Sequence, residues 1–381
     1  MTDAGASDVL IVGAGPTGCA AGIVLARAGI DVAVVDRAHF PRDKTCGDAI
    51  SNDGMTLVEE LGARAELERG PHAVVRRAAA IFPDGNRITR DYDPPGYIIP
   101  RYRFDDSLRH ALEASGARLL QDRRVSTLRR LSGVVVGADG PDFEWSSKIV
   151  IAADGYGSVG LSALGQSAPK GQYLAVSATA YLQGVAFPDG PDTADHYFDR
   201  ELPFGYGWIF PAVEGTSNVG VYQRADVYAR GGRNPKELMS DFVARKAERF
   251  AGTEQVGKIR VWSLPIAPRP EPVTAPGLLL AGDAGGFVDP LSGEGIWQAL
   301  YTGILAGCAA RDGVLRGELS ASMREQYERT CRRDVSGPSR SKALVQRALA
   351  VLVDRKLYRS RLVRSALSWG YRHRALEMTK S

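Results

Sequence analysis

The sequence predicts an α/β protein in which a Rossmann-like domain, split in the sequence, surrounds an inserted domain built on an antiparallel sheet and is followed by C-terminal helices. Three observations predict this fold class. A glycine-rich turn lies between an apolar strand and a helix near the N-terminus. A second apolar strand, followed by Gly-Asp, occurs near residue 280. Between them, residues 170–265 show the alternation of apolar and polar residues that is typical of antiparallel strands.

The first βαβ unit lies at the N-terminus. Residues 9–12 form an apolar, β-branched run, and the pattern G-x-G-x-x-G follows at Gly13, Gly15 and Gly18. The first glycine permits a tight turn, the second leaves room for a pyrophosphate, and the third lets the next helix approach the strand. Asp36 ends the second strand, where its carboxylate can accept hydrogen bonds from a ribose hydroxyl. Together these features predict dinucleotide binding rather than an ordinary βαβ turn.

The middle of the chain changes character twice. A polar loop over residues 37–48 precedes a helix, and residues 72–100 are typical of β-structure with turns. A helix follows Arg101, and a buried strand over residues 148–153 ends at Asp154. Alternating strands then dominate, which indicates the inserted domain.

The nucleotide-binding pattern then returns. An apolar strand over residues 277–281 leads into Gly282-Asp283, and a loop that includes Pro290, Gly293 and Gly295 opens a long helix. We therefore predict three units. The split domain comprises residues 1–70, 101–169 and 270–335, the inserted β-sheet domain comprises residues 71–100 and 170–269, and a basic helical tail comprises residues 336–381.

Composition excludes several classes of protein. No apolar run reaches the ~18 residues that a membrane-spanning helix needs, and the N-terminus lacks the pattern of a secretion signal. The four cysteines show no C-x-x-C spacing and the histidines are scattered, so we expect reduced thiols, a cytoplasmic protein and no metal site. The net charge is +4, but residues 340–381 carry eleven Lys/Arg and two Asp/Glu, so the rest of the chain is acidic. Nucleic-acid binding is therefore not expected.

The motifs, in this order and spacing, resemble those of FAD-dependent oxidoreductases of the para-hydroxybenzoate hydroxylase fold, and most of all the geranylgeranyl reductase family. The resemblance covers nearly the whole chain up to about residue 330. It is carried by the glycine pattern at residues 13–18, Lys44-Thr45-Cys46-Gly47, Arg101-x-x-Phe104-Asp105, Ala153-Asp154-Gly155, residues 205–211, Gly282-Asp283 and residues 290–295. It implies that the split domain is an FAD-binding domain and that the inserted domain binds the substrate.

The resemblance also implies roles for individual residues. Cys46, Tyr206 and Trp208 are the candidate catalytic residues: the thiol as a proton donor near the isoalloxazine ring, and the two rings as walls of an apolar cavity. Their alternative interpretations are a small buried thiol and ordinary sheet core. The residues predicted to bind FAD are Gly13, Gly15, Gly18, Asp36, Arg37, Cys46, Gly47, Arg101, Asp154, Gly282, Asp283, Pro290, Gly293 and Gly295. Gly160 stands where the family's Asp-Gly motif usually has an arginine.

The implied activity is the reduction of C=C bonds in an isoprenoid or lipid-like substrate, with NAD(P)H as the electron donor. The alternative is an FAD-dependent monooxygenase that hydroxylates or epoxidises its substrate. Because the chain has no second G-x-G-x-x-G, electrons come either from NAD(P)H docking transiently or from a separate electron donor protein. The expected partners are a small hydrophobic substrate and no nucleic acid. The basic tail either covers the FAD-binding domain or makes a peripheral contact with an anionic membrane.

Overall fold

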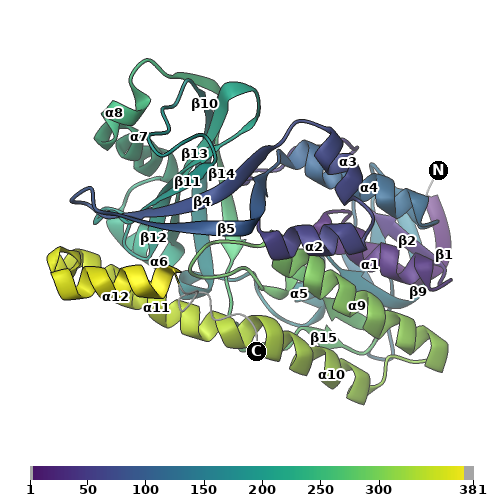
Figure 1. The fold of residues 1–381 in the computed structure, drawn as a ribbon. Helices are drawn as coiled ribbons and strands as arrows, with labels where there is room; N and C mark the ends of the chain where they lie inside the picture. Colours follow the sequence, from purple (N-terminus) through teal and green to yellow (C-terminus); the bar gives the residue numbers. More distant parts are fainter. Residues whose placement is uncertain (1–2, 373–381) are drawn as a thin grey trace.

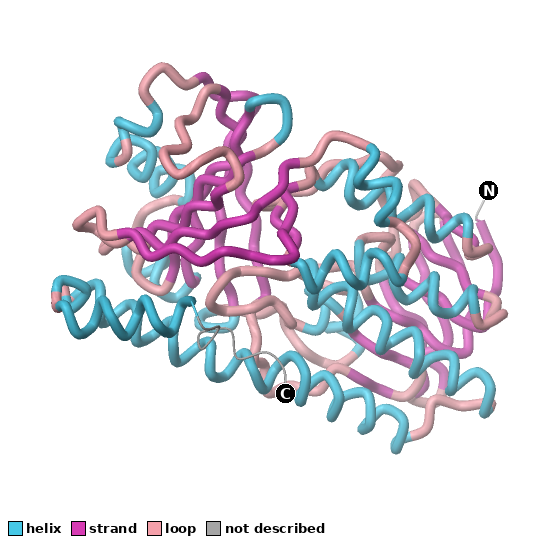
Figure 2. Tube along the Cα trace, in the orientation of Figure 1, coloured by secondary structure: helices cyan, strands magenta, loops and turns pink. Residues whose placement is uncertain are grey.

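The computed structural model describes residues 3–372, which fold around two β-sheets (Figure 1). The strands of the two sheets form two separate groups, one in each half of the molecule (Figure 2). Helices surround the sheet that begins at the N-terminus, and fewer helices cover the other sheet. The predicted α/β class is therefore confirmed.

The first sheet is mostly parallel. Within residues 3–372 its spatial order is β15 (Thr274–Ala275), β16 (Leu278–Leu280), β9 (Phe143–Ala152), β1 (Asp3–Val12), β2 (Val32–Val35) and β6 (Arg118–Leu120), and a hairpin of β7 (Thr127–Leu131) and β8 (Val134–Gly140) pairs with the start of β9. The run from β16 to β6 is parallel throughout. The carboxyl ends of β1, β9 and β16 therefore meet at one edge, which is where such sheets bind ligands.

The second sheet is mostly antiparallel, and among the strands of the described residues only β11 and β4 pair in parallel there. Its spatial order is β14 (Glu254–Pro265), β10 (Leu174–Gln183), β13 (Thr216–Arg224), β12 (Gly205–Pro211), β11 (Thr193–Tyr197), β4 (Ala73–Ile81), β5 (Arg87–Ile98) and β3 (Ala49–Ile50). Because β3 joins this sheet, the loop that carries Cys46 runs from one sheet to the other.

Helices pack on both faces of the first sheet. Val9 and Ile11 face a core shared with α1 (Pro16–Arg27), α4 (Arg101–Ala114) and α9 (Ile296–Arg316). Leu10 and Val12 face a second core shared with α5 (Val159–Ala163). The alternation of neighbouring residues between two apolar cores explains why β1 is an apolar run rather than an alternating one.

Two glycines bring α9 against α1. A Cβ on Gly303 would lie 2.4 Å from the Thr17 carbonyl oxygen, and one on Gly307 would lie 3.0 Å from the Ala21 carbonyl oxygen. The two helices therefore touch through their backbones, and this contact places the start of α9 beside the glycine-rich turn. The remaining helices of this half are α2 (Asn52–Glu60), α3 (Arg64–Arg69) and α10 (Ala321–Cys331).

The second sheet has one covered face and one that turns toward the first domain. Leu238, Met239 and Phe242 of α7 (Pro235–Arg245) cover the outer face, with α6 (Ala225–Gly231) and α8 (Ala247–Phe250) beside it. On the other face, Trp208 and Phe210 share a core with Val288 from the segment that follows β16. This inner face is where the two halves of the protein meet.

The basic tail reaches both halves. α11 (Gly337–Asp354) begins beside the first domain and runs toward the second sheet (Figure 1). α12 (Arg361–Arg372) follows it, and Val353 and Tyr358 pack there with Phe82 and Ile88. The tail is therefore not simply a cover for the predicted FAD-binding domain. Its last nine residues, 373–381, lie outside the described residues. No helix within residues 3–372 is long and apolar enough to cross a membrane.

Candidate active site

The glycine-rich turn after β1 is sterically fixed. Gly13 has φ +100°, and a Cβ there would lie 2.5 Å from the Ala153 carbonyl oxygen. A Cβ on Gly18 would lie only 1.8 Å from the Gly13 carbonyl oxygen, so no other residue fits without moving α1. At Gly15 a Cβ would meet only Arg42, at 3.5 Å, so the turn is open on this side. This is the shape of a cradle that brings backbone N–H groups close to a phosphate.

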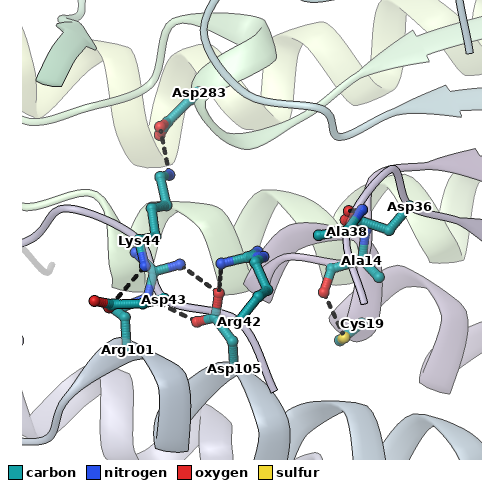
Figure 3. Close-up of polar contacts among 10 residues, drawn as sticks. All are labelled: Ala14, Cys19, Asp36, Ala38, Arg42, Asp43, Lys44, Arg101, Asp105 and Asp283. Carbon is teal, nitrogen blue, oxygen red and sulfur yellow. Dashed lines mark hydrogen bonds and ion pairs between the residues drawn. The ribbon is translucent and has the colours of Figure 1, made fainter. Parts of the chain in front are cut away.

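Asp36 stabilises this turn through hydrogen bonds. Its carboxylate accepts hydrogen bonds from the backbone N–H groups of Ala14, at 2.7 Å, and Ala38, at 2.8 Å (Figure 3). The carboxylate retains further lone pairs for the predicted ribose contact, because each oxygen can accept more than one hydrogen bond.

The carboxyl ends of β9 and β16 lie beside the same turn. Asp154 lies against Gly13, and its carboxylate accepts the Val159 N–H at 2.8 Å. Within residues 3–372 its second oxygen, Oδ1, is buried and has no hydrogen-bond partner. Burial raises the pKa of Asp154, and hydrogen bonds, among them the one from Val159, and then the charge of exposed Arg37 oppose this. Gly282 has φ +60°, and a Cβ there would lie 2.2 Å from the Thr17 hydroxyl oxygen at the start of α1.

Ion pairs join the Cys46 loop to α4 and to the segment that follows β16 (Figure 3). Arg101 forms two hydrogen bonds of 2.7 Å with Asp105, and Arg42 contacts the same carboxylate at 2.7 Å. Burial acts to raise the pKa of Asp105, but the charges of Arg101 and Arg42 outweigh it and hold the pKa below its usual value. Lys44 lies 3.4 Å from Asp283. The predicted FAD ligands Arg101 and Asp283 therefore already have ionic partners.

Three side chains donate hydrogen bonds to the loop before α9. Tyr206 donates a hydrogen bond to the Ser292 carbonyl, and Tyr222 donates one to the Pro290 carbonyl at 2.9 Å. Gln346 of α11 also donates to the Pro290 carbonyl, at 2.5 Å. The loop that contains the predicted FAD ligands is thus bound to both the inner sheet face and the tail.

Asp289 fixes this loop from within. It is buried, and it accepts the N–H groups of Leu291 and Ser292 at 2.8 and 2.9 Å. Lys342 of α11 neutralises it at 2.5 Å. Gly293 has φ +68°, and Gly295 precedes the first turn of α9, whose N–H groups favour a negative charge. Asp289, Lys342 and Gln346 were not among the predicted residues, because only the folded tail brings them together.

The inner face of the second sheet is an aromatic wall. The Tyr206 and Trp208 ring centroids are 6.1 Å apart, and those of Trp208 and Phe210 are also 6.1 Å apart. Gly220 makes room for Trp208, since a Cβ there would lie 2.2 Å from the indole ring. Gly47 faces the same ring, with a would-be Cβ 3.6 Å from it. The predicted catalytic rings thus lie beside the Cys46 loop.

Cys46 is half-buried and packs against the core of the first sheet. Burial raises the pKa of its thiol, and the charge of Arg101 opposes the increase. Its carbonyl accepts a hydrogen bond from the Asn218 side chain at 2.9 Å. The thiol is therefore neutral at pH 7, as a proton donor must be, although a merely buried thiol would be neutral as well.

Two residues away, the sequence prediction missed a buried carboxyl group. Asp48 has φ +61° and is 1% exposed. Its carboxylate accepts hydrogen bonds from Tyr181 and, at 3.0 Å, from Asn218. In the sequence, Asp48 belongs to a polar loop, and nothing near it indicates burial. Among residues 3–372 no group of three or more His, Cys, Asp or Glu could hold a metal ion.

Comparison with known proteins shows the family. A family model described as FAD binding domain matches residues 6–338. The menaquinone reductase of Mycobacterium tuberculosis is 32% identical over 79% of this chain and 75% of its own length. This chain belongs to the geranylgeranyl reductase family of FAD-dependent oxidoreductases. Its resemblance to that family, inferred from the motifs, is therefore confirmed.

Two further comparisons extend this result. Digeranylgeranylglycerophospholipid reductase 1 of Methanothermobacter thermautotrophicus is 29% identical over 92% of this chain and 88% of its own length. The crystal structure of a geranylgeranyl bacteriochlorophyll reductase-like protein from Thermoplasma acidophilum shares the fold, with a TM-score of 0.82 at 22% identity, covering 93% of this chain and 90% of that one. Flavin-dependent halogenases share the fold too, so the fold alone does not select the reaction.

The residues at the strand ends fit FAD. The turn at residues 13–18 leaves no room for Cβ atoms at Gly13 and Gly18, and the N-terminal turn of α9 lies at the same edge. The Asp154 oxygen that has no partner in the described part of the chain adjoins this turn. Backbone N–H groups, carboxylates and a helix N-terminus are what a dinucleotide with ribose and phosphate groups needs. The individual contacts to FAD stay predictions.

Proposed function

We propose that this flavoprotein reduces C=C bonds of an isoprenoid or lipid-like substrate with electrons from NAD(P)H. The aromatic wall carries the proposal: Tyr206, Trp208 and Phe210 form one buried apolar cluster beside the loop of Cys46 and the edge of the first sheet. Such a wall suits a hydrocarbon chain, which offers few polar atoms for recognition. The relatives named as menaquinone and digeranylgeranylglycerophospholipid reductases support the same choice of substrate.

Different residues of the chain would bind the cofactor, position the loop before α9, bind the substrate and donate the proton. FAD, when bound, supplies hydride chemistry. The glycine-rich turn, Asp36 and Asp283 would hold it, while Asp289 and Lys342 fix the loop before α9. The aromatic wall would bind the alkene and exclude water. A proton must also reach the second alkene carbon, and Cys46 is the donor that the family resemblance suggests.

A monooxygenase is the second candidate. The observation in its favour is that flavin-dependent halogenases share the fold, and these proteins use the same cofactor for a different reaction. An apolar wall would serve hydroxylation or epoxidation of a hydrocarbon equally well.

The two candidates differ in the fate of oxygen. We expect the holoenzyme, reduced anaerobically with NADPH or NADH, to convert a prenylated substrate to a product heavier by two hydrogen atoms. The measurement is mass spectrometry of the product, repeated under ¹⁸O₂. Product that carries ¹⁸O would contradict the reductase and support the monooxygenase. If neither nicotinamide reduces the flavin but a reduced ferredoxin does, the electron donor is a separate protein.

The tail suggests how such a substrate is reached. Leu362 and Trp369 of α12 are 84% and 62% exposed, and they lie seven residues apart on one helix face. Arg355, Lys356 and Arg361 are exposed close to them in the chain. Exposed apolar residues beside cations are typical of helices that lie on anionic membranes. We propose that α12 brings the enzyme to such a surface.

Vesicle binding tests this proposal. The enzyme should co-sediment with phosphatidylglycerol vesicles and not with phosphatidylcholine vesicles. The L362S/W369S variant should lose about tenfold or more in binding, because two apolar side chains that would enter the lipid are removed. A matched control is L315S, which changes a 71% exposed leucine at the end of α9. Equal binding to both lipids, or equal loss in the control, would exclude membrane contact through α12.

A further inference from the structure

Asp48 lies at the centre of a hydrogen-bond network on the inner face of the second sheet. Its backbone carbonyl accepts the Ile99 N–H at 3.0 Å, which fixes the loop, and its side chain is buried. A non-glycine residue with positive φ is strained, and strain of this kind concentrates at functional sites. The residue is therefore held in place although a buried carboxyl group is costly.

The contacts of Asn218 determine which groups donate and which accept in this network. Its side-chain oxygen accepts hydrogen bonds from Trp208 and Thr179, both at 2.9 Å. Its side-chain nitrogen donates to the Cys46 carbonyl at 2.9 Å and to Asp48 at 3.0 Å. Because each amide atom already has two partners, Asn218 can only donate to Asp48 and cannot take its proton.

Tyr181 completes the network and faces the aromatic wall. In the sheet, Tyr181 lies opposite Asn218, and Asn218 lies opposite Phe210. Residues directly opposite one another point to the same face, so Tyr181 shares the inner face with Phe210 and Trp208. Its side chain is only partly buried, whereas Asp48 is 1% exposed. The phenol therefore contacts Asp48 and lies on the same sheet face as the aromatic wall.

Burial and the neighbouring groups together allow Asp48 to exchange a proton near neutral pH. Burial raises the pKa of Asp48 to about 7, while hydrogen bonds from Tyr181 and Asn218 and the charge of Arg101 oppose this. Asp43, the nearby acid, also raises it and is itself paired with Arg260. The pKa of Tyr181 is raised by burial and by Asp48, so the phenol keeps its proton. A buried acid poised near 7 in an apolar site suits general acid catalysis.

We propose that Tyr181 and Asp48 together are the proton donor of the reaction, an inference that rests on the proposed reduction of a C=C bond. The reductant supplies the hydride to one alkene carbon. When Asp48 is protonated, it donates to the phenol oxygen in place of accepting from it, and the Tyr181 O–H turns toward the substrate. The Tyr181 O–H bond then breaks as its proton forms the C–H bond at the other carbon, and the Asp48 proton passes to the phenol oxygen. Tyr181 is thereby restored, Asp48 is left as a carboxylate, and solvent returns one proton before the next turnover.

Infrared titration of the oxidised holoenzyme tests the pair without turnover. The wild type should show a protonated-carboxyl C=O band that disappears with a midpoint about pH 7, and this band should be absent in D48N. In Y181F the midpoint should move to higher pH, because the ionised carboxylate loses the hydrogen bond that favours it. The S177A variant, on the same face of β10, is the control and should titrate like the wild type. A band that persists in D48N, or an unmoved midpoint in Y181F, would overturn the inference.

Single-turnover experiments give the second readout. With pre-reduced holoenzyme, D48N and Y181F should form product at least about 100-fold more slowly, while their FAD content and rate of flavin reduction stay near those of the wild type. Wild-type rates in these variants, with loss only in C46S, would assign the proton to the thiol and overturn the pair. If the wild type inserts oxygen and reduces no C=C bond, the proposed function itself fails, which this series distinguishes from failure of the pair alone.

Discussion

The Gly18→Val variant should purify as a colourless protein that binds FAD at least about 100-fold more weakly than the wild type. A Cβ at this position would lie 1.8 Å from the Gly13 carbonyl oxygen, whereas an ordinary contact is 3.4–4 Å. Because Gly13 itself lies against Ala153, the turn cannot retreat and α1 must move away from β1. The N–H groups that would face the pyrophosphate move with it.

Visible absorbance of the purified protein and a fluorescence titration with FAD measure this effect. The matched control is Gly231→Ala in α6, where a Cβ meets nothing within 4 Å and the backbone has no positive φ. That variant should keep its colour and its melting temperature. Circular dichroism separates loss of the site from loss of the fold. A yellow, folded Gly18→Val protein with wild-type affinity would show that this turn does not hold the cofactor.

The same turn shows what could be predicted from the sequence. Gly13, Gly18 and Asp36 act within one short βαβ unit, so their spacing alone determines the local geometry. The family and the α/β class followed because similar short motifs recur at Asp154 and Gly282, each directly after an apolar strand. Contacts between residues that are close in the sequence can therefore be predicted from the sequence pattern alone.

Asp48 shows what could not be predicted. Its burial depends on Tyr181 and Asn218, which lie 133 and 170 residues further along the chain. Asp48 follows Gly47 in a polar stretch with Pro and Gly, a composition that indicates an exposed loop. The pairing of β3 with β5 overrides that local preference and draws the loop under the second sheet. Lys342 is a similar case, because the basic composition of the tail predicts a solvated residue and the fold gives it a buried partner, Asp289.

Replacing Arg101 with Met should lower the free energy of unfolding at pH 7 by about 3–5 kcal/mol, the usual effect of breaking a buried ion pair. Arg101 and Asp105 are 4% and 1% exposed, and two hydrogen bonds of 2.7 Å join them. Arg42 remains beside Asp105, but one cation replaces two. Urea denaturation followed by circular dichroism, at several pH values, measures the loss.

The pH dependence of this loss has a definite sign. In the wild type, Arg101 and Arg42 hold the pKa of Asp105 below its usual 3.8, so the pair stabilises the protein above that pH and less as the pH falls. In the variant, burial acts against fewer charges, and ionised Asp105 becomes costly. The difference in stability between wild type and variant should therefore be largest at pH 7 and shrink toward pH 4. A pH-independent difference would mean that packing, not charge, causes the loss.

The double variant R101M/D105L separates stability from cofactor binding. Removing both charges leaves no unpaired anion in the core, and Arg42, which loses its partner Asp105, has a side chain that is 20% exposed to solvent. Replacing a buried ion pair by apolar residues is often neutral or stabilising, so part of the lost stability should return. If FAD affinity returns with it, Arg101 serves the site only by holding Asp105 and α4 in place. If the double variant is stable but binds FAD more weakly, the guanidinium itself contacts the cofactor, as the Arg101-x-x-Phe104-Asp105 motif implies. Either result gives Arg101 a role that is measured and not only implied by the motif.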